Sequence, residues 1–193
     1  FKTWKKETGY EKNKRKSHRI IAIDYGIKKN ILRYFSNFNC EVIVVPCKLN
    51  AEAIIKLKPH GIFLSNGPGD PAAVEHTIST LREIAGEIPT FGICLGHQAI
   101  GEAFNCKIKK HSEIYHGKVS EIYHDNSSKL YQDIPLSFKA TRYHSLIIDQ
   151  NTISSDINIK AWLDDGTVMG VEHSKQKLFG VQLNDGFVKP GCE

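Results

Sequence analysis

The sequence predicts an α/β protein with a doubly wound, mostly parallel sheet flanked by helices, and with a smaller antiparallel sheet in its second half. Three observations lead to this fold class. The apolar runs of the first half are continuous rather than alternating, as in strands that are buried on both faces of a parallel sheet. Stretches with helical spacing separate these runs, so strand and helix alternate along the chain. The second half instead carries several shorter strand-like runs in succession, some of which we expect to pair antiparallel.

The individual elements follow from these patterns in chain order. The first strand, Arg19–Asp24, is an uninterrupted apolar run closed by an aspartate. The other strands of the first half are Glu41–Pro46, Gly61–Ser65 and Thr90–Ile93, and the helices between them are Lys28–Phe38, Ala51–Leu57 and Val74–Ala85. The strands predicted in the second half are Lys107–Tyr123, Phe138–Ile148, Ile157–Trp162, Thr167–His173 and Leu178–Gln182. In a doubly wound sheet, ligands bind at the carboxyl ends of the strands.

Length and composition limit the class of protein. The chain has 193 residues, of which 40% are hydrophobic and 24% are charged, as in a soluble domain with its own core. No apolar run approaches the roughly 20 residues that span a bilayer, so we expect no membrane segment. The five cysteines include no C-x-x-C pair, which argues against a disulfide framework or a zinc site and favours a reducing cytoplasm.

Charge is unevenly distributed along the chain. The formal net charge is +5, but residues 1–19 hold eight Lys and Arg against two Glu, so the rest of the chain carries a net charge of −1. The basic run Lys12–Lys16 has no interleaved aromatic residues, and we therefore expect no nucleic-acid partner. The polar stretch 1–18, which starts at Phe1, is interpreted as a linker or the remnant of a preceding domain. Residues 19–193 form the predicted domain.

The most informative stretch is Gly92-Ile93-Cys94-Leu95-Gly96-His97-Gln98, a Gly-x-Cys-x-Gly motif directly after a predicted strand. It has the form of a nucleophile elbow, in which a strand ends, the chain turns sharply and a helix begins under the nucleophile. The two glycines allow the turn and the close packing beside it, and the helix N-terminus favours a negatively charged sulfur. A single cysteine near a strand is otherwise typical of a small buried hydrophobe. The flanking glycines favour Cys94 as a nucleophile.

A second motif, Leu64-Ser65-Asn66-Gly67-Pro68-Gly69-Asp70-Pro71, follows the third strand. Together the two motifs closely resemble class I glutamine amidotransferases, the glutaminase domains that use a catalytic triad. The resemblance runs from about Ile20 to Gln182. Within the family it is divided. Two segments, Asp24–Arg33 and Gly61–Pro71, resemble the small chain of carbamoyl-phosphate synthetase. Three others resemble the amidotransferase of anthranilate or aminodeoxychorismate synthase: His116–Ser120, Thr141–Leu146 and Asp165–Gly170.

The resemblance implies a mechanism and a set of site residues. Cys94 would attack the side-chain amide carbon of glutamine and release ammonia, leaving a glutamyl thioester that water hydrolyses. The backbone amides of Gly67 and Leu95 would stabilise the oxyanion. Glycines in the first loop would let the backbone approach the substrate closely. The implied substrate contacts are Gly67, Gly69, Leu95, Gln98, Ser145 and Leu146. No metal or organic cofactor is implied for this domain.

The chain departs from the family pattern after Gln182. In the family, a strand like Phe179–Gln182 is followed by an aromatic residue and then His-Pro-Glu, in which the His activates the Cys and the Glu orients the His. Here Asn184 replaces that His and Gly186 replaces that Glu. We therefore expect the domain to be truncated or altered after residue 182, with a loss of general-base catalysis that is worth roughly 10²–10⁴-fold. Two hypotheses would restore activity. The elbow alone would lower the thiol pKa enough for slow thioester formation, or one of three histidines would substitute for the base: His97, His144 or His173.

The resemblance implies a glutaminase domain that passes ammonia to a synthase partner. We expect that partner to be the large chain of carbamoyl-phosphate synthetase, which would use bicarbonate and ATP. One alternative is the amidotransferase component of anthranilate or aminodeoxychorismate synthase. Another is a catalytically dead homologue that binds glutamine or only docks to the synthase. A cysteine hydrolase of other γ-glutamyl substrates agrees less well with the Asn66–Pro71 loop.

Overall fold

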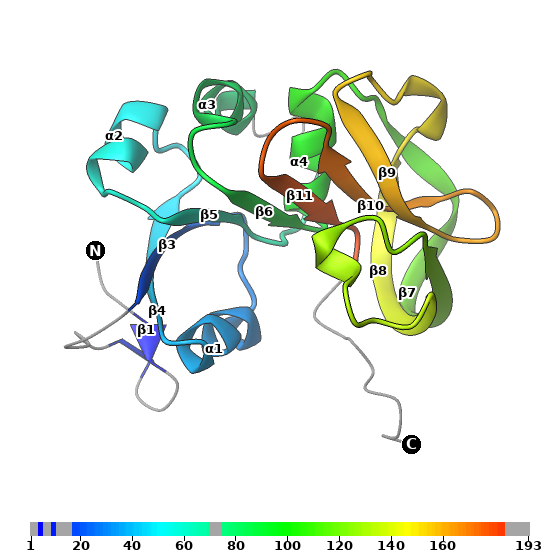
Figure 1. Cartoon of the computed structure of the whole chain (residues 1–193), viewed down its shortest axis with the longest axis horizontal. Helices are drawn as coiled ribbons and strands as arrows, with labels where there is room; N and C mark the ends of the chain where they lie inside the picture. The colour runs from blue at the N-terminus through cyan, green and yellow to red at the C-terminus, as the bar shows by residue number, and fades with distance from the viewer. Residues whose placement is uncertain (1–3, 6–8, 11–16, 70–74, 184–193) are drawn as a thin grey trace.

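A computed structural model describes residues 4–5, 9–10, 17–69 and 75–183 (Figure 1). The strands of its main sheet are β3 (His18–Asp24), β4 (Cys40–Pro46), β5 (Gly61–Leu64), β6 (Thr90–Ile93), β7 (Ile108–His124), β8 (Ser137–Ile148), β9 (Ile157–Trp162), β10 (Val168–His173) and β11 (Leu178–Val181). The α-helices are α1 (Lys29–Asn37), α2 (Ala51–Lys56), α3 (Glu75–Ile84) and α4 (Leu95–Ala103), and short 3₁₀ turns cover Lys129–Tyr131 and Gln150–Thr152. The nine strands lie in the order β4-β3-β5-β6-β11-β10-β9-β7-β8.

The first half of the chain forms the parallel part of the sheet, as predicted. β3 pairs with β4 on one side and with β5 on the other, β5 pairs with β6, and β6 pairs with β11, all in parallel. Figure 1 shows α1 on one face of these strands and α2, α3 and α4 on the other. Ile21 and Ile23 of β3 are accordingly buried in the core under α2–α4, and Ala22 is buried in the core under α1. Burial on both faces explains the continuous apolar run of this strand.

The second half adds antiparallel strands to the same sheet. β11 pairs in parallel with β6 and antiparallel with β10, so the sheet changes type at this strand. β9 pairs antiparallel with both β10 and β7, and β7 pairs antiparallel with β8. The predicted α/β class is confirmed, and the antiparallel strands are continuous with the parallel ones because β11 uses both of its edges. β7 and β8 are 17 and 12 residues long and agree with the predicted ranges to within one residue at each end. They stay paired across two irregularities of register.

The register of the parallel strands brings their carboxyl ends together. Ile23 of β3 lies opposite Leu64 of β5, Leu64 lies opposite Gly92 of β6, and Ile93 lies opposite Val181 of β11. The segments that follow β5, β6 and β11 therefore begin at the same edge of the sheet, which is the edge that binds ligands in doubly wound folds.

The N-terminal stretch, predicted to be a linker, contains a small hairpin. Its two strands, β1 (Trp4–Lys5) and β2 (Gly9–Tyr10), pair antiparallel and are not part of the main sheet. β1 lies beside α1 and β4 (Figure 1). The first strand of the main sheet begins at His18, next to a hydrogen bond of 3.3 Å from the Ser17 N–H to the Asn39 carbonyl. That residues 1–18 end a preceding domain stays a prediction.

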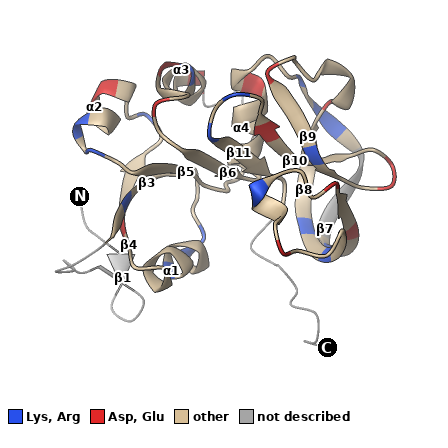
Figure 2. Cartoon of the chain, in the orientation of Figure 1, with Lys and Arg blue, Asp and Glu red and all other residues tan. Residues whose placement is uncertain are grey.

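Charged residues of both signs are interspersed along the described helices and strands (Figure 2). This distribution agrees with the net charge of −1 that the chain carries after residue 19. Among the described helices, none is long and apolar enough to cross a membrane.

Candidate active site

Cys94 lies where β6 ends and α4 begins, in the strand–turn–helix arrangement that the motif predicts. Its backbone has φ 53° and ψ −104°, a conformation that residues other than glycine rarely adopt and that costs on the order of 1–3 kcal/mol. Two hydrogen bonds hold the turn. The Cys94 N–H donates to the Val181 carbonyl at 2.8 Å, and the Cys94 carbonyl accepts from the Gln98 N–H at 3.0 Å. The sheet and the helix therefore impose the backbone that orients the thiol.

The two glycines of the motif are explained by packing, since the positive φ falls on Cys94 itself. A Cβ on Gly92 would lie 2.6 Å from the Gly96 carbonyl, and a Cβ on Gly96 would lie 2.7 Å from Leu64 Cβ. Both distances are far inside van der Waals contact, so α4 can begin directly against β5 and β6 only with glycine at these two positions. The predicted close packing beside the elbow is confirmed.

The loop after β5 is fastened to the loop between β3 and α1. The Ser65 hydroxyl accepts from the Tyr25 N–H at 3.0 Å and donates to the Asn66 carbonyl at 2.7 Å. The Asn66 side chain accepts from the Lys28 N–H at 3.2 Å and donates to the Gly26 carbonyl at 3.4 Å. These contacts fix the backbone just before Gly67, the predicted oxyanion donor.

The two glycines of this loop are explained in different ways. A Cβ on Gly67 would lie 2.7 Å from the Tyr25 Cβ, so the residue is a glycine because the loop touches the β3–α1 connection. The sequence predicts another reason, a close approach of the substrate. Gly69 has φ 114° and open space where its Cβ would be, so its backbone conformation favours glycine. The roles of the Gly67 N–H in oxyanion stabilisation and of Gly69 in substrate binding stay predictions.

Opposing effects act on the thiol of Cys94. Burial is the largest of them and raises its pKa above the ordinary value, because the residue is only 8% exposed. The Leu95 N–H at the start of α4 acts in the opposite direction, followed by the Lys28 ammonium and the Gln182 side chain. The expectation that the elbow alone lowers the thiol pKa is wrong, since the desolvation of the charged sulfur outweighs these three groups.

Two buried glutamines connect Cys94 to β8. Gln98, one turn into α4, donates from Nε2 to the Leu146 carbonyl and to Gln182 Oε1, both at 3.0 Å. Gln182 follows β11 directly and is fully buried, and its Nε2 lies 3.6 Å from Cys94 Sγ. The predicted substrate residue Gln98 is therefore linked to the sulfur through Gln182, and its side-chain NH₂ group is engaged by the protein.

The predicted substrate residues Ser145 and Leu146 are neighbours on β8, so their side chains point to opposite faces of the sheet. The Leu146 carbonyl reaches the site through its contact with Gln98. The side chain of Ser145 is exposed, and only its backbone is adjacent to this contact. The structure thus brings together Cys94, Leu95, Gln98 and Leu146.

Two of the three histidines considered as substitute bases are neutral because they are buried. The ring of His97 packs on Gly180, where a Cβ would lie 2.9 Å from Nδ1, and burial lowers the pKa of His97 to about 3. Burial, reinforced by the charges of Arg142 and His111, lowers the pKa of His144 to about 4. A general base works best with a pKa near the operating pH, so neither imidazole is suited to that role.

His173 is separated from the sulfur by the length of a strand. It lies at the carboxyl end of β10, which runs antiparallel to β11, so it is at the edge of the sheet opposite to Cys94. Its Nδ1 accepts from the N–H groups of Lys175 and Gln176 at 3.1 and 3.2 Å, and its ring packs edge-on against Phe104. His173 therefore stabilises the β10–β11 turn, and the expectation that it substitutes for the base is wrong.

Two residues near the sulfur, Lys28 and Gln182, are not among those that the sequence predicts. The pairing of β11 with β6 is the signal that locates Gln182, because the residue after Val181 must lie beside the residue after Ile93. Lys28 comes from the start of α1, and its ammonium also lies 5.3 Å from the centre of the Tyr143 ring. The replaced triad positions, 184 and 186, lie outside the described residues.

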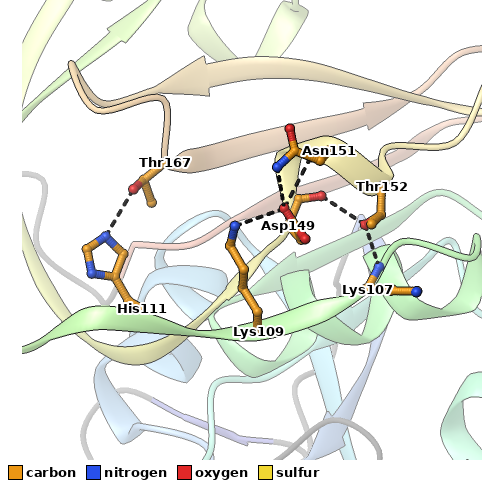
Figure 3. Close-up of polar contacts among 7 residues, drawn as sticks. All are labelled: Lys107, Lys109, His111, Asp149, Asn151, Thr152 and Thr167. Atoms are coloured by element: carbon orange, nitrogen blue, oxygen red, sulfur yellow. Dashed lines mark hydrogen bonds and ion pairs between the residues drawn. The ribbon is translucent and has the colours of Figure 1, made fainter.

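A hollow of about 430 Å³ lies next to β7 and β8. It is lined by Lys109, Lys110, His111, Ile147, Ile148, Gln150, Asp165, Gly166 and Thr167, none of which is a predicted site residue. Figure 3 shows that polar groups here contact one another. Lys109 pairs with Asp149 at 2.9 Å, and His111 lies 3.2 Å from the Thr167 hydroxyl. Within the described part of the chain, no group of three His, Cys, Asp or Glu side chains could hold a metal ion.

The fold is shared with solved amidotransferase structures. One is the crystal structure of a protein assigned as a GMP synthase subunit from Thermoplasma acidophilum, with a TM-score of 0.75 at 17% identity, covering 86% of this chain and 83% of that one. Another is a glutamine amidotransferase from Thermotoga maritima, with a TM-score of 0.69 at 15% identity, covering 88% of this chain and 76% of that one. At these identities the likeness concerns the fold alone.

Sequence comparison extends the likeness to carbamoyl phosphate synthase small chains. The chloroplastic small chain of Oryza sativa subsp. japonica is 36% identical over 87% of this chain and 36% of its own length. The small chain of Bradyrhizobium diazoefficiens is 36% identical over 94% of this chain and 45% of its own length. The chain thus spans less than half the length of these relatives. A family model described as glutamine amidotransferase class-I matches residues 21–183. The chain belongs to the class I glutamine amidotransferase family.

Proposed function

We propose that this chain is the glutaminase domain of a carbamoyl-phosphate synthetase small chain, which releases ammonia from glutamine for a synthase partner. The observation that carries the proposal is the elbow at Cys94, which stands at the carboxyl end of β6 beside the Gly67 loop of the neighbouring β5. Similarity to a small chain over 94% of the residues supports this branch of the family.

The proposed reaction uses the groups around the sulfur. Cys94 Sγ forms a bond to the side-chain amide carbon of glutamine, the C–N bond breaks, and the thiol proton ends on the departing nitrogen, which leaves as ammonia. The backbone N–H groups of Gly67 and Leu95 stabilise the negative charge that develops on the carbonyl oxygen. Water then attacks the thioester, which yields glutamate and restores the thiol.

The substrate's α-amino and α-carboxyl groups are proposed to contact the β8 backbone at Ser145 and Leu146, together with Gln98 and Gly69. The hydrogen bond between Gln98 and the Leu146 carbonyl supports this placement, since it joins the strand to the elbow helix. A carbonyl oxygen accepts two hydrogen bonds, so Leu146 can bind the substrate amino group while Gln98 stays in place.

The proposed partner is the large chain of carbamoyl-phosphate synthetase, which would use ATP and bicarbonate. Free ammonia is mostly protonated at neutral pH, so the glutaminase must deliver it directly to the enzyme that consumes it. We propose no metal or organic cofactor for this domain. A cytoplasmic location is part of the proposal, and it is supported by four cysteines of the described residues that are free thiols: Cys40, Cys47, Cys94 and Cys106.

The test is glutamate release from glutamine by the purified chain, with the Cys94→Ala variant as control, in the absence and presence of the large chain. Release that requires Cys94 and increases with the large chain supports the proposal. Release that increases only with the synthase component for anthranilate or aminodeoxychorismate gives the chain the alternative acceptor, which the similarity of Thr141–Leu146 favours. Equal glutamate release from the wild-type chain and the Cys94→Ala variant would refute the role of the thiol.

A second candidate function is glutamine binding or docking without turnover. Asn184 and Gly186 in place of the family His and Glu favour it, and so does the raised pKa of the buried Cys94 thiol. Calorimetric binding of glutamine without glutamate release would select this alternative. In that case the double substitution Asn184→His with Gly186→Glu should bring release back, since it supplies the missing base and its orienting carboxylate.

A further inference from the structure

The side-chain amide of Gln182 has only one orientation that agrees with its neighbours. The Leu146 carbonyl can only accept a hydrogen bond, so Gln98 must present its NH₂ group there, at 3.0 Å. The same NH₂ group lies 3.0 Å from the Gln182 side chain, which must therefore turn its oxygen toward Gln98. The NH₂ group of Gln182 then faces Cys94 Sγ, at 3.6 Å. The Leu146 carbonyl of β8 thus determines, through Gln98, that the nitrogen of the Gln182 amide and not its oxygen contacts the sulfur.

We propose that Gln182 is the hydrogen-bond donor that holds the Cys94 sulfur as an acceptor, and that Gln98 acts through it as a positioning residue. This inference rests on the proposed role of Cys94 as the nucleophile. It gives Gln98 a task in the free enzyme beyond the substrate contact predicted from the sequence.

The donor has a chemical consequence. A hydrogen bond to a charged acceptor is roughly twice as strong as one between neutral groups, so the Gln182 N–H favours the thiolate over the thiol. Because an amide N–H donates and takes up no proton, Gln182 stabilises the nucleophile without serving as its base. Gln182 is fully buried, so no water competes for this N–H. The hydrogen bond therefore offsets part of the desolvation of the sulfur.

Among the described residues, two groups besides Gln182 act on the Cys94 thiol, and the contribution of Gln182 can be measured against theirs. Lys28 contributes a positive charge from the start of α1, and the Leu95 N–H contributes a donor from α4. His97 on α4 and His144 on β8 are neutral at neutral pH because burial lowers the pKa of each imidazole. A substitution at Gln182 removes one of these contributions and leaves the Lys28 and Leu95 groups in the protein, so the wild-type chain is the reference for their effect.

The experiment measures the rate at which iodoacetamide alkylates Cys94 as a function of pH, in the full chain without glutamine, by mass spectrometry of the Cys94 peptide. The pH midpoint reports thiol ionisation and is independent of how accessible the sulfur is. Gln182→Met removes the donor but keeps the length of the side chain. We expect its midpoint to rise by about one pH unit, with an approximately tenfold slower reaction at neutral pH. Gln176→Met, at the opposite edge of the sheet, is the matched control and should leave the midpoint unchanged.

A folded Gln182→Met variant with an unchanged midpoint would overturn the proposal, since the glutamine would then only fill space. Gln98→Met tests the positioning role and should raise the midpoint by less, because the Gln182 amide could then turn over. If both variants fail to fold, NMR of the wild-type chain decides. The side-chain NH₂ resonances of Gln182 must shift with the same midpoint as the thiol, and resonances that stay constant refute the contact.

These readouts separate this inference from the proposed function. If the chain releases no glutamate but Gln182→Met shifts the thiol midpoint, the proposed turnover is refuted and the role of Gln182 is supported. If the chain releases glutamate but all variants have the same thiol midpoint, the proposed turnover is supported and the role of Gln182 is refuted.

Discussion

Replacing Gly96 by alanine should destabilise the fold more than the same replacement elsewhere in the same helix. Gly96 is where α4 touches β5, and a Cβ there would lie 2.7 Å from Leu64 Cβ and still closer to the Leu64 carbonyl oxygen. At Gly101 the nearest obstacle, at 2.6 Å, is the terminal Cδ1 of Ile148. The Leu64 backbone and Cβ beside Gly96 are fixed in the sheet, whereas the end of the Ile148 side chain beside Gly101 can rotate away. Gly101→Ala is therefore the matched control.

The magnitude follows from the overlap. Ordinary contacts begin at about 3.4 Å, so α4 would have to move away from β5 by roughly 0.7 Å or more. Overpacking of this kind costs about 1–3 kcal/mol, and contact with backbone places Gly96→Ala near 3. Alanine regains up to about 1 kcal/mol of helix propensity at either position. We therefore expect a net loss of about 2 kcal/mol for Gly96→Ala, and a change of about 1 kcal/mol or less for Gly101→Ala.

Thermal unfolding followed by circular dichroism measures the difference. In a chain of this size, 2 kcal/mol lowers Tm by about 4–8 °C. Cys94 directly precedes α4, so the same displacement moves the thiol and should change its alkylation rate in Gly96→Ala but not in Gly101→Ala. Equal Tm values for the two variants would refute the packing explanation of the Gly-x-Cys-x-Gly motif.

Three further predictions concern stability. Tm should fall as the pH is lowered from 7 to 5, because His97 and His144, whose pKa values are lowered by burial to about 3 and about 4, stay neutral in the fold while the unfolded chain takes up protons below about pH 6.5. His144→Gln should flatten this dependence, and a flat wild-type profile would contradict the burial argument. Ile100→Ala, which empties a fully buried position of α4, should cost about 2–5 kcal/mol in urea unfolding. Glu52→Gln, which breaks an exposed pair with Lys56, should change the unfolding free energy by about 0.5 kcal/mol or less in the same assay.

The parallel half of the fold could be predicted because its signals are local. The apolar run at Arg19–Asp24 is continuous because β3 has a helical layer on each of its faces, and burial of this kind leaves its trace in consecutive residues. The position of β11 between β6 and β10 leaves no comparable trace. It depends on pairing between Val181 and Ile93, which are far apart in the sequence. For this reason the sequence predicts every strand of the antiparallel part but not its continuity with the parallel part.

The candidate site divides in the same way. Cys94 and its flanking glycines can be recognised in the sequence because the elbow is built from consecutive residues. The physical reason for a glycine at position 67 cannot be recognised in the sequence, since the atom that excludes a side chain there belongs to Tyr25. The direction in which the thiol pKa is shifted cannot be predicted from the sequence either. The motif predicts a helix N-terminus, which lowers the thiol pKa. The burial that raises this pKa comes from the surrounding sheet and loops.

The same non-local burial decides what the histidines can do. The ordinary pKa of a cysteine thiol is 9.0 and burial raises that of Cys94, whereas the pKa of His144 is lowered to about 4. Proton transfer from this thiol to this imidazole is therefore strongly unfavourable, and it is less favourable still for His97. Leu95 and Gln182, two described neighbours of the sulfur, donate hydrogen bonds to it and do not accept its proton. With these described groups alone, turnover requires that the thiol proton passes directly, or through water, to the departing nitrogen.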